Sequence, residues 1–261
     1  MTISDIWCEK YRPSTLDEIV LDKSTKTYFN KVQVEQNIPN VLFVGKPGIG
    51  KTSLAKIIVK DILKCQYLYI NASDENGIDT IRTKVLNFAQ TKSLFGQIKV
   101  IILDECDGLS IDAQKALRNS IEEYHDLTRF ILTANYKHKI IPALQSRCQI
   151  FDITYDKNEY LTKLISIVKA EEIKINKENF TNIVNSCYPD FRKGINALQK
   201  YYLSDGENTT SNITTEFLDG LIDLLSQRKY FLIRKAIIEN EASFNSDYDE
   251  LFRRLFNYMY A

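Results

Sequence analysis

The sequence predicts an α/β fold in which a five-stranded parallel sheet is followed by helices only. Short apolar runs alternate with helical patterns up to residue 152, and a glycine-rich turn joins the first run to a helix. Parallel strands are apolar on both sides because crossover helices cover both faces of the sheet. After residue 152 the strand pattern stops and only helical periodicity remains.

Five apolar runs are the expected strands. Each run is short and is bounded by polar or turn residues, which is the pattern of a buried strand. The runs lie at 41–44, 67–70, 100–103, 130–132 and 150–151.

Crossover helices are expected at 51–63, at 78–90 and after Ser110. Ser110 is a suitable N-cap, because its hydroxyl can accept a hydrogen bond from an unpaired N–H group of the first helical turn. The positions that follow at three- and four-residue spacing share one helical face and are expected in the core. They are Ala113, Leu117, Ile121 and Tyr124.

Helical periodicity continues through the rest of the chain. One apolar stripe is expected from Leu161, Leu164, Ile165 and Val168. The segment 204–215 is rich in Ser, Asp, Gly, Asn and Thr, which is typical of a linker. Further helices are expected at 217–225, 230–238 and 248–260.

Composition excludes several classes of protein. No apolar run approaches the roughly 20 residues of a membrane span, and the first ten residues lack an apolar signal segment, so we expect a soluble, intracellular protein. The five cysteines form no CxxC pair and there are only two histidines, which gives no zinc-ligand spacing. The net charge of zero argues against a uniformly basic nucleic-acid coat protein. Any DNA contact has to come from a local patch.

A phosphate-binding motif follows the first apolar run. The segment 45–52 matches GxxxxGK[ST], whose glycines let backbone N–H groups turn toward phosphate oxygens at a helix N-terminus. Lys51 is expected to reach the β- and γ-phosphates of ATP, and Thr52 to offer its hydroxyl to Mg²⁺. An ordinary glycine turn is the alternative, which the flanking strand and helix disfavour. The predicted ATP-binding residues here are Gly45, Lys46, Pro47, Gly48, Ile49, Gly50, Lys51, Thr52 and Ser53.

Polar side chains also follow the third and fourth runs. Asp104 and Glu105 end the third run, at the sheet edge where ligands bind in open α/β sheets. Asp104 is expected to hold Mg²⁺, and Glu105 to polarise an attacking water. Asn135 follows the fourth run within expected reach of the γ-phosphate or that water, although it also fits a turn residue. On sequence alone, Arg147 and Arg192 fit solvated or salt-bridged surface residues.

Together these motifs resemble the AAA+ ATPase subunits of sliding-clamp loaders, most closely the small subunits of replication factor C, with phage clamp-loader subunits as relatives. The resemblance runs from Trp7 to about Gln199. It includes the opening Trp7-Cys8-Glu9-Lys10-Tyr11-Arg12-Pro13, the Asn71-Ala72-Ser73-Asp74 segment and the diagnostic triplet Ser146-Arg147-Cys148. It implies a nucleotide site that also contains Tyr11, Arg12 and Pro13 beside the adenine, and Val20.

The same resemblance implies that subunits share their ATP sites. Arg147 would act in trans as a finger in the neighbouring subunit's site, an effect worth about 10³ to 10⁵ in rate, and Arg192 would contact the γ-phosphate in cis. The implied partners are other clamp-loader subunits in a hetero-pentamer, a sliding clamp and primer–template DNA, in a nucleus or at a viral or phage replication site. The implied domains are a nucleotide-binding AAA+ domain at 1–152, a helical lid at 153–205 and a short helical collar at 206–261.

DNA contacts are implied at the helix starts that follow the second and third strands. Backbone amides there suit phosphates and fix position without reading bases. Gln114 and Arg118 are also expected to couple this surface to Asp104 and Glu105, while ordinary exposed helix residues remain the alternative. The candidates are Ile78, Arg82, Ser110, Gln114, Lys115 and Arg118.

Two other functions stay open at this stage. One is a different AAA+ DNA-processing ATPase, such as a helicase loader or a branch-migration motor. The other is a scaffold subunit that binds nucleotide without turnover. Three features depart from the family pattern: Asn76 replaces a basic residue, Cys106 replaces an alanine, and the collar is short.

Overall fold

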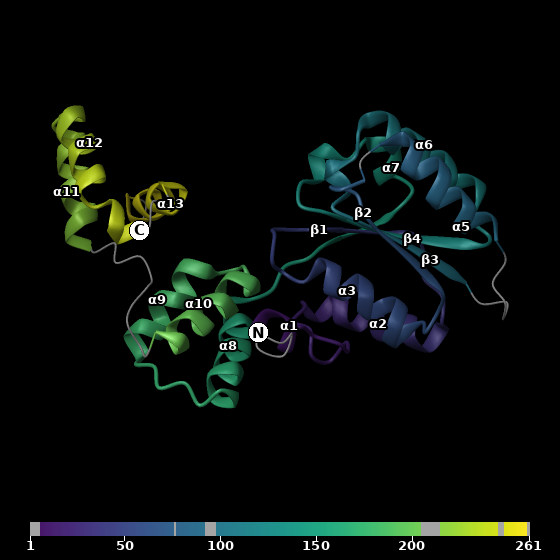
Figure 1. Ribbon diagram of the computed structural model, residues 1–261, viewed down its shortest axis with the longest axis horizontal. Coiled ribbons are helices and arrows are strands. Elements are labelled where there is room, and N and C mark those ends of the chain that lie inside the picture. The colour runs from purple at the N-terminus through teal and green to yellow at the C-terminus, as the bar shows by residue number, and fades with distance from the viewer. Residues whose placement is uncertain (1–5, 76, 92–97, 205–214, 245–247, 260–261) are drawn as a thin grey trace. The chain divides into compact units, whose positions relative to one another are not determined.

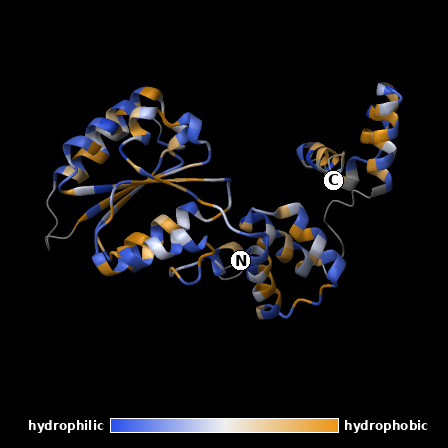
Figure 2. Cartoon of the chain, turned by 180° about the vertical axis from the view of Figure 1, so that it is seen from behind, coloured by the Kyte–Doolittle hydropathy of each residue, from blue (hydrophilic) through white to orange (hydrophobic). Residues whose placement is uncertain are grey.

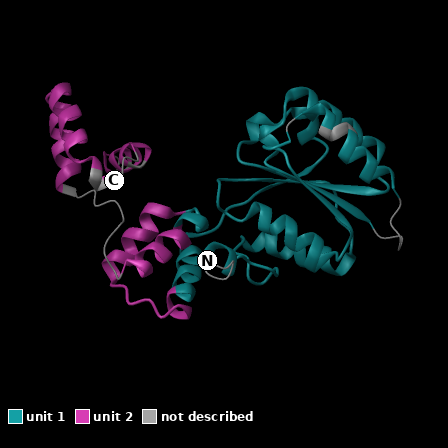
Figure 3. Cartoon of the chain, in the orientation of Figure 1, with its two compact units in different colours: residues 1–167, 189–193 teal, residues 168–188, 194–261 magenta. Residues whose placement is uncertain are grey.

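A computed structural model describes residues 6–75, 77–91, 98–204, 215–244 and 248–259 of the chain. They belong to two compact units (Figure 3). Unit 1 comprises Met1–Ile167 and Pro189–Lys193, and unit 2 comprises Val168–Tyr188 and Gly194–Ala261. Asn76 and residues 205–214 of the expected linker lie outside the described residues. The three domains expected from sequence, with their boundaries, stay a prediction.

Unit 1 contains the predicted five-stranded parallel sheet, in the order β2-β3-β4-β1-β5. Each expected run lies inside one observed strand, so the strand predictions are confirmed. This order places β4 between β1 and β3, and the polar residues that follow these three strands therefore meet at one edge. The strands are β1 (Val41–Val44), β2 (Tyr67–Asn71), β3 (Lys99–Asp104), β4 (Thr128–Ala134) and β5 (Gln149–Asp152).

Helices cover both faces of the sheet (Figure 1). One face carries α2 (Lys23–Glu35), which the sequence analysis missed, and α3 (Lys51–Ile57). The other face carries α5 (Leu86–Gln90), α6 (Ile111–Glu123) and α7 (Pro142–Gln145). Hydrophobic colour is concentrated in the strands between them (Figure 2).

Helix α6 packs as predicted. The Ser110 hydroxyl accepts a hydrogen bond of 3.2 Å from the Ala113 N–H and so caps the helix. Ala113, Leu117 and Ile121 are buried in the main core, and the half-buried Tyr124 packs against them. The amphipathic face thus fixes the rotation of α6 on the sheet.

Two predicted helices are less regular than expected. The segment expected at 51–63 consists of α3 followed by a π-helical turn, Ile58–Ile62. The segment expected at 78–90 consists of α4 (Ile78–Thr80), a π-helical turn at Ile81–Val85, and α5. Apolar spacing predicts helix but does not distinguish these winding variants.

Helix α8 (Lys157–Ala170) buries a different stripe from the one predicted. The buried side chains are Tyr160, Leu164 and Ile167, whereas Ile165 is 40% exposed. Tyr160 fixes this rotation, because its ring contacts that of Phe191 with the centroids 4.7 Å apart. Only Leu164 of the expected stripe is fully buried, so that prediction was wrong in phase.

The elements that follow α8 are helical, as predicted. Helices α11 (Thr215–Ser226), α12 (Tyr230–Glu239) and α13 (Tyr248–Met259) pack around a small core that contains Leu218 and Leu251. None of the helices in the described part of the chain combines the length and hydropathy needed to cross a membrane. The other helices are α1 (Trp7–Lys10), α9 (Lys177–Cys187) and α10 (Phe191–Leu203).

Candidate nucleotide-binding site

The loop between β1 and α3 has a backbone that requires glycine. Gly48 and Gly50 adopt φ values of 73° and 98°, in the left-handed region that other residues rarely occupy. A Cβ atom at Gly48 would also lie 1.8 Å from the Asp190 carboxylate oxygen. The Phe191 N–H donates to the Gly48 carbonyl at 3.1 Å, so the segment that carries Arg192 lies against this loop. Such a glycine loop at a helix start fits a chain of phosphates.

Lys51 is buried at the centre of the loop, with 7% of its surface exposed. Its ammonium group donates at 2.8 Å to the carbonyls of Gly45 and Lys46 and to the Asn135 side-chain oxygen. Burial lowers the pKa of Lys51 to about 8, and the nearby Asp104 carboxylate opposes this shift. A bound phosphate would favour the charged form. The hydrogen bond between Lys51 and Asn135 brings these two predicted site residues together. Their expected contacts with ATP stay a prediction.

Asp104 ends β3 and is the best-connected carboxylate of the site. Its side chain accepts from the Thr52 hydroxyl at 2.8 and 2.9 Å and from the Thr133 hydroxyl at 2.6 Å. The Tyr69 phenol donates to the second oxygen at 2.8 Å. A carboxylate beside a hydroxyl is the oxygen chemistry that suits Mg²⁺, so the two predicted metal ligands lie next to each other.

Glu105 points toward the loop that follows β2. It has a left-handed backbone, with φ 56°, and its N–H donates to the Thr133 hydroxyl at 2.9 Å. Its carboxylate accepts from the Ser73 hydroxyl. Glu105 therefore lies at the same sheet edge as Asp104 but has a separate partner.

Sequence reasoning missed three residues that hold these carboxylates. Thr133 is buried and bridges Asp104 to the Glu105 backbone. Tyr69 bonds Asp104, and partial burial together with that bond raises the pKa of Tyr69 far above its usual value. A signal existed for Thr133, because it is a polar residue near the end of an apolar strand. Tyr69 and Ser73 depend on β2 lying next to β3, which no local pattern shows.

The N-terminal segment lies close to the same loop. Trp7 is buried, and the Tyr11 ring meets it edge-on at 6.5 Å between centroids. A Cβ at Gly50 would lie 3.5 Å from the Ile19 side chain, which places the neighbouring, half-buried Val20 near the loop. Arg12 pairs with Glu9 at 2.8 Å and is exposed, and Pro13 is half-buried.

Arg192 lies in the segment that contacts the loop. Its carbonyl accepts from the Cys8 thiol at 3.5 Å, which joins the N-terminal segment to it. Its side chain is exposed, and its charge is close enough to Lys51 to contribute to the lowered pKa of that lysine. Arg192 is thus on the same side of unit 1 as the P-loop lysine.

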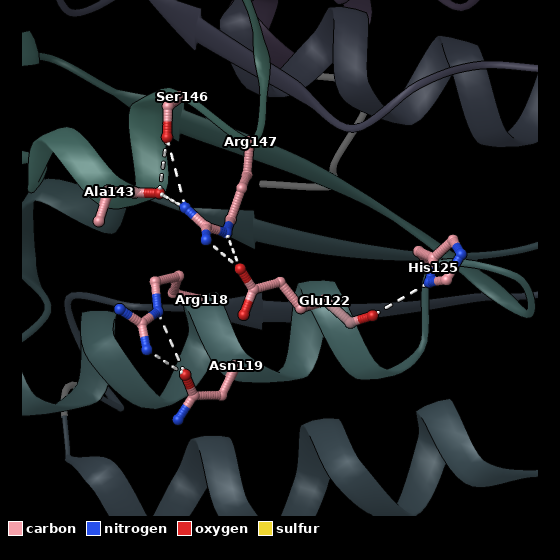
Figure 4. Close-up of polar contacts among 7 residues, drawn as sticks. All are labelled: Arg118, Asn119, Glu122, His125, Ala143, Ser146 and Arg147. Atoms are coloured by element: carbon pink, nitrogen blue, oxygen red, sulfur yellow. Dashed lines mark hydrogen bonds and ion pairs between the residues drawn. The ribbon is translucent and has the colours of Figure 1, made fainter.

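Arg147 has its own set of partners (Figure 4). It follows α7 and forms an ion pair with Glu122 of α6, with Nε 2.5 Å from the carboxylate oxygen. Its Nη1 donates to the Ala143 carbonyl at 2.7 Å. Among the contacts described for Arg147, none involves Lys51 or Asp104.

The DNA candidates have different surroundings. Gln114 is only 1% exposed and differs from the expectation: its amide donates to the Leu109 and Lys139 carbonyls and accepts from the Ile141 N–H. This burial argues against a direct DNA contact by that side chain. Ile78 is half-buried, and Ser110 caps α6. Lys115 pairs with Asp112, and Arg118 bonds Asn119. Arg82 lies in a π-helical turn, and its side chain is outside the described residues.

Comparison with known proteins agrees with this geometry. Residues 41–155 match the family model described as ATPase family associated with various cellular activities (AAA). The chain also has the fold of RuvB from Thermotoga maritima, described as a Holliday junction branch migration motor, with a TM-score of 0.61 at 18% identity over 84% of this chain and 80% of that one. This likeness shows the fold alone. The fold and the site therefore define an AAA protein.

Closer relatives narrow the family. The chain is 46% identical over 203 residues to the replication factor C small subunit of Methanococcus vannielii, covering 74% of this chain and 63% of that protein. It is 37% identical over 236 residues to that of Methanosphaera stadtmanae, covering 88% of this chain and 71% of the relative. The chain belongs to the replication factor C small subunit family. It spans less than two thirds of the Methanococcus vannielii relative's length.

Proposed function

We propose that this chain is an ATP-hydrolysing subunit of a sliding-clamp loader, which opens the clamp and places it on primer–template DNA during replication. The observation that carries the proposal is the contact of the Thr52 hydroxyl with both oxygens of Asp104, at 2.8 and 2.9 Å. It joins the phosphate-binding loop to the acidic strand end at a distance that suits shared magnesium coordination. The family relationship supports the choice of a clamp loader.

In this proposal the loop 45–53 wraps the phosphates of ATP, and the N-terminal segment lies beside the adenine. Lys51 neutralises the β- and γ-phosphates in place of its contacts with the Gly45 and Lys46 carbonyls. Thr52 and Asp104 hold Mg²⁺, which neutralises charge on the phosphate oxygens when it is bound. Arg192 reaches the γ-phosphate from the same chain.

Turnover requires three further roles. Glu105 polarises the attacking water, and for this its carboxylate leaves Ser73, its partner here. Asn135 orients the water or the γ-phosphate from the end of β4, where it already bonds Lys51. Arg147 stabilises the charge of the transition state in a neighbouring subunit, so the complete site needs two chains.

DNA contacts the chain at helix N-termini, which bind phosphates, rather than through side chains that read bases. The N-terminus of α6 and the α4 region offer backbone amides to phosphates, with Lys115 and Arg118 adding charge. Gln114 ties the acidic segment to the loop after β4 through Leu109, Lys139 and Ile141. A shift of α6 on DNA would therefore move groups next to Asp104 and Glu105.

The test is the ATPase rate of the complex purified through a tag on this chain, with and without primed DNA and a sliding clamp of the same family. We expect stimulation by DNA and clamp together, beyond either alone. Stimulation by branched or duplex DNA with no effect of the clamp would favour another AAA+ DNA motor. A rate that stays the same in a Lys51→Ala complex would favour the scaffold function, since turnover would then come from other subunits.

A further inference from the structure

Glu122 holds Arg147 along one edge of its guanidinium group. The Nε and Nη2 atoms of Arg147 both donate to the same oxygen of Glu122, and Nη1 donates to the Ala143 carbonyl at 2.7 Å. Figure 4 shows Glu122 beneath the arginine, with Ala143 and Ser146 on the other side. The guanidinium is therefore held from two elements, α6 and α7.

The outer edge of the guanidinium, formed by Nη1 and Nη2, is only partly occupied by the described contacts. Nη1 contacts the Ser146 hydroxyl at 3.4 Å, which is long for a hydrogen bond. Nη1 and Nη2 carry four of the five N–H groups of arginine, and this pair of nitrogens is the edge that can grip an oxyanion with two bonds. Among the described contacts, the bonds to Ala143 and Glu122 use two of these four N–H groups, and the remaining two have at most the long contact with Ser146.

Both partners stand on rigid backbone. Ile121, the neighbour of Glu122, is 2% exposed in the main core, and Leu144, within α7, is fully buried. The pair itself is exposed, with 31% of the Arg147 and 48% of the Glu122 side chain accessible. An ion pair this exposed adds little to stability. The ion pair does restrict the rotamers of the long Arg147 side chain, whose guanidinium has to point in one direction to act.

We propose that Glu122 is a positioning residue for Arg147. It orients the guanidinium before a neighbouring subunit docks, so that the arginine side chain does not have to become ordered when the transition state forms. This inference rests on the proposed trans role of Arg147. The carboxylate acts through its acceptor oxygen, because its negative charge next to an incoming phosphate would be unfavourable. An amide oxygen at the same place should therefore replace it.

The experiment compares Glu122→Ala, Glu122→Gln, Arg147→Ala and the double variant Glu122→Ala with Arg147→Ala, each in the purified complex. Glu122→Ala should lower kcat by about 10- to 100-fold, because a misplaced group of this kind costs up to about that much. KM and the melting temperature should stay as in Glu123→Ala, which removes the adjacent carboxylate. Glu122→Gln should restore most of the rate.

Double substitution separates positioning from other roles. In the Arg147→Ala background, Glu122→Ala should cause no further loss, since it acts only through that arginine. A wild-type or raised rate in Glu122→Ala, or an additional loss in the double variant, would overturn the inference and leave the finger role of Arg147 intact. A wild-type rate in Arg147→Ala would instead remove the trans finger itself, and this inference with it.

Discussion

Two charged regions of unit 1 are built in opposite ways. Lys51 and Asp104 are 7% and 6% exposed, and each side chain bonds three residues in the described part of the chain. Arg147 and Glu122 are 31% and 48% exposed at their side chains and lie on other elements. The buried region brings the predicted phosphate-binding and metal-binding side chains together within one chain. The exposed pair lies at the surface, where the proposed role of Arg147 in trans would require it.

Arg147→Ala is expected to have the largest effect on the exposed region. The assembled complex should lose turnover by about 10³-fold or more at this chain's interface, because a finger of this type is worth 10³ to 10⁵ in rate. Single-turnover ATPase measurements with nucleotide-binding titrations would show it. ATP binding by the variant chain itself should remain, and a variant that loses its own ATP binding would place Arg147 in the cis region.

Glu105→Gln tests the buried region. Turnover should fall by about 10²- to 10⁴-fold, since a general base contributes that much, while ATP affinity changes little. Fluorescent-nucleotide binding and phosphate release measure the two quantities. Glu123→Gln, which changes an exposed carboxylate of α6, should leave both unchanged. Turnover at the wild-type rate in Glu105→Gln would exclude Glu105 as the base.

The lowered pKa of Lys51 predicts how binding depends on pH. With a pKa of about 8 in the free chain, most Lys51 is charged at pH 7 and most is neutral at pH 9. Bound phosphates keep it charged, so the apparent Kd for ATP should rise about 10-fold from pH 7 to pH 9. Lys51→Arg stays charged and should bind with little pH dependence. An equally flat profile for the wild type would contradict the burial of this ammonium.

Tyr69→Phe should have the smallest effect. It removes one of the donors to Asp104, and a partly exposed hydrogen bond contributes roughly 1 kcal/mol or less. The magnesium concentration for half-maximal turnover should change by about 3-fold, with little change at saturation. Tyr67→Phe, at the first residue of β2, is the matched control. Equal effects of the two substitutions would show that Tyr69 acts through the strand rather than through Asp104.

Local pattern predicted the parts of the fold that local chemistry determines. The five strands, the cap of α6 and its buried face follow from apolar spacing and from Ser110, and the glycine loop from its own motif. The rotation of α8 did not, because the Tyr160 ring contacts Phe191, 31 residues away in the chain. The burial of Gln114 was missed for the same reason, since its partners Lys139 and Ile141 belong to a distant loop.

The contacts within the site also divide into those that local sequence predicts and those that depend on distant packing. Lys51, Thr52, Asp104 and Asn135 end or follow strands of the predicted parallel sheet, which places them at one edge. The strand order that makes these strands neighbours was not predicted. The partners that orient the carboxylates and the finger come from pairings that the sequence does not show. Glu122 and Arg147 are separated by β4, a short 3-10 helix and α7, and only packing makes them adjacent.

The most direct test of a shared ATP site is the ATPase rate per chain as a function of chain concentration, without other subunits. A finger that acts only in trans predicts a low rate that rises with concentration as copies meet, and rises further when partner subunits are added. A fast rate that is independent of concentration, in a sample shown to be monomeric, would contradict the trans site.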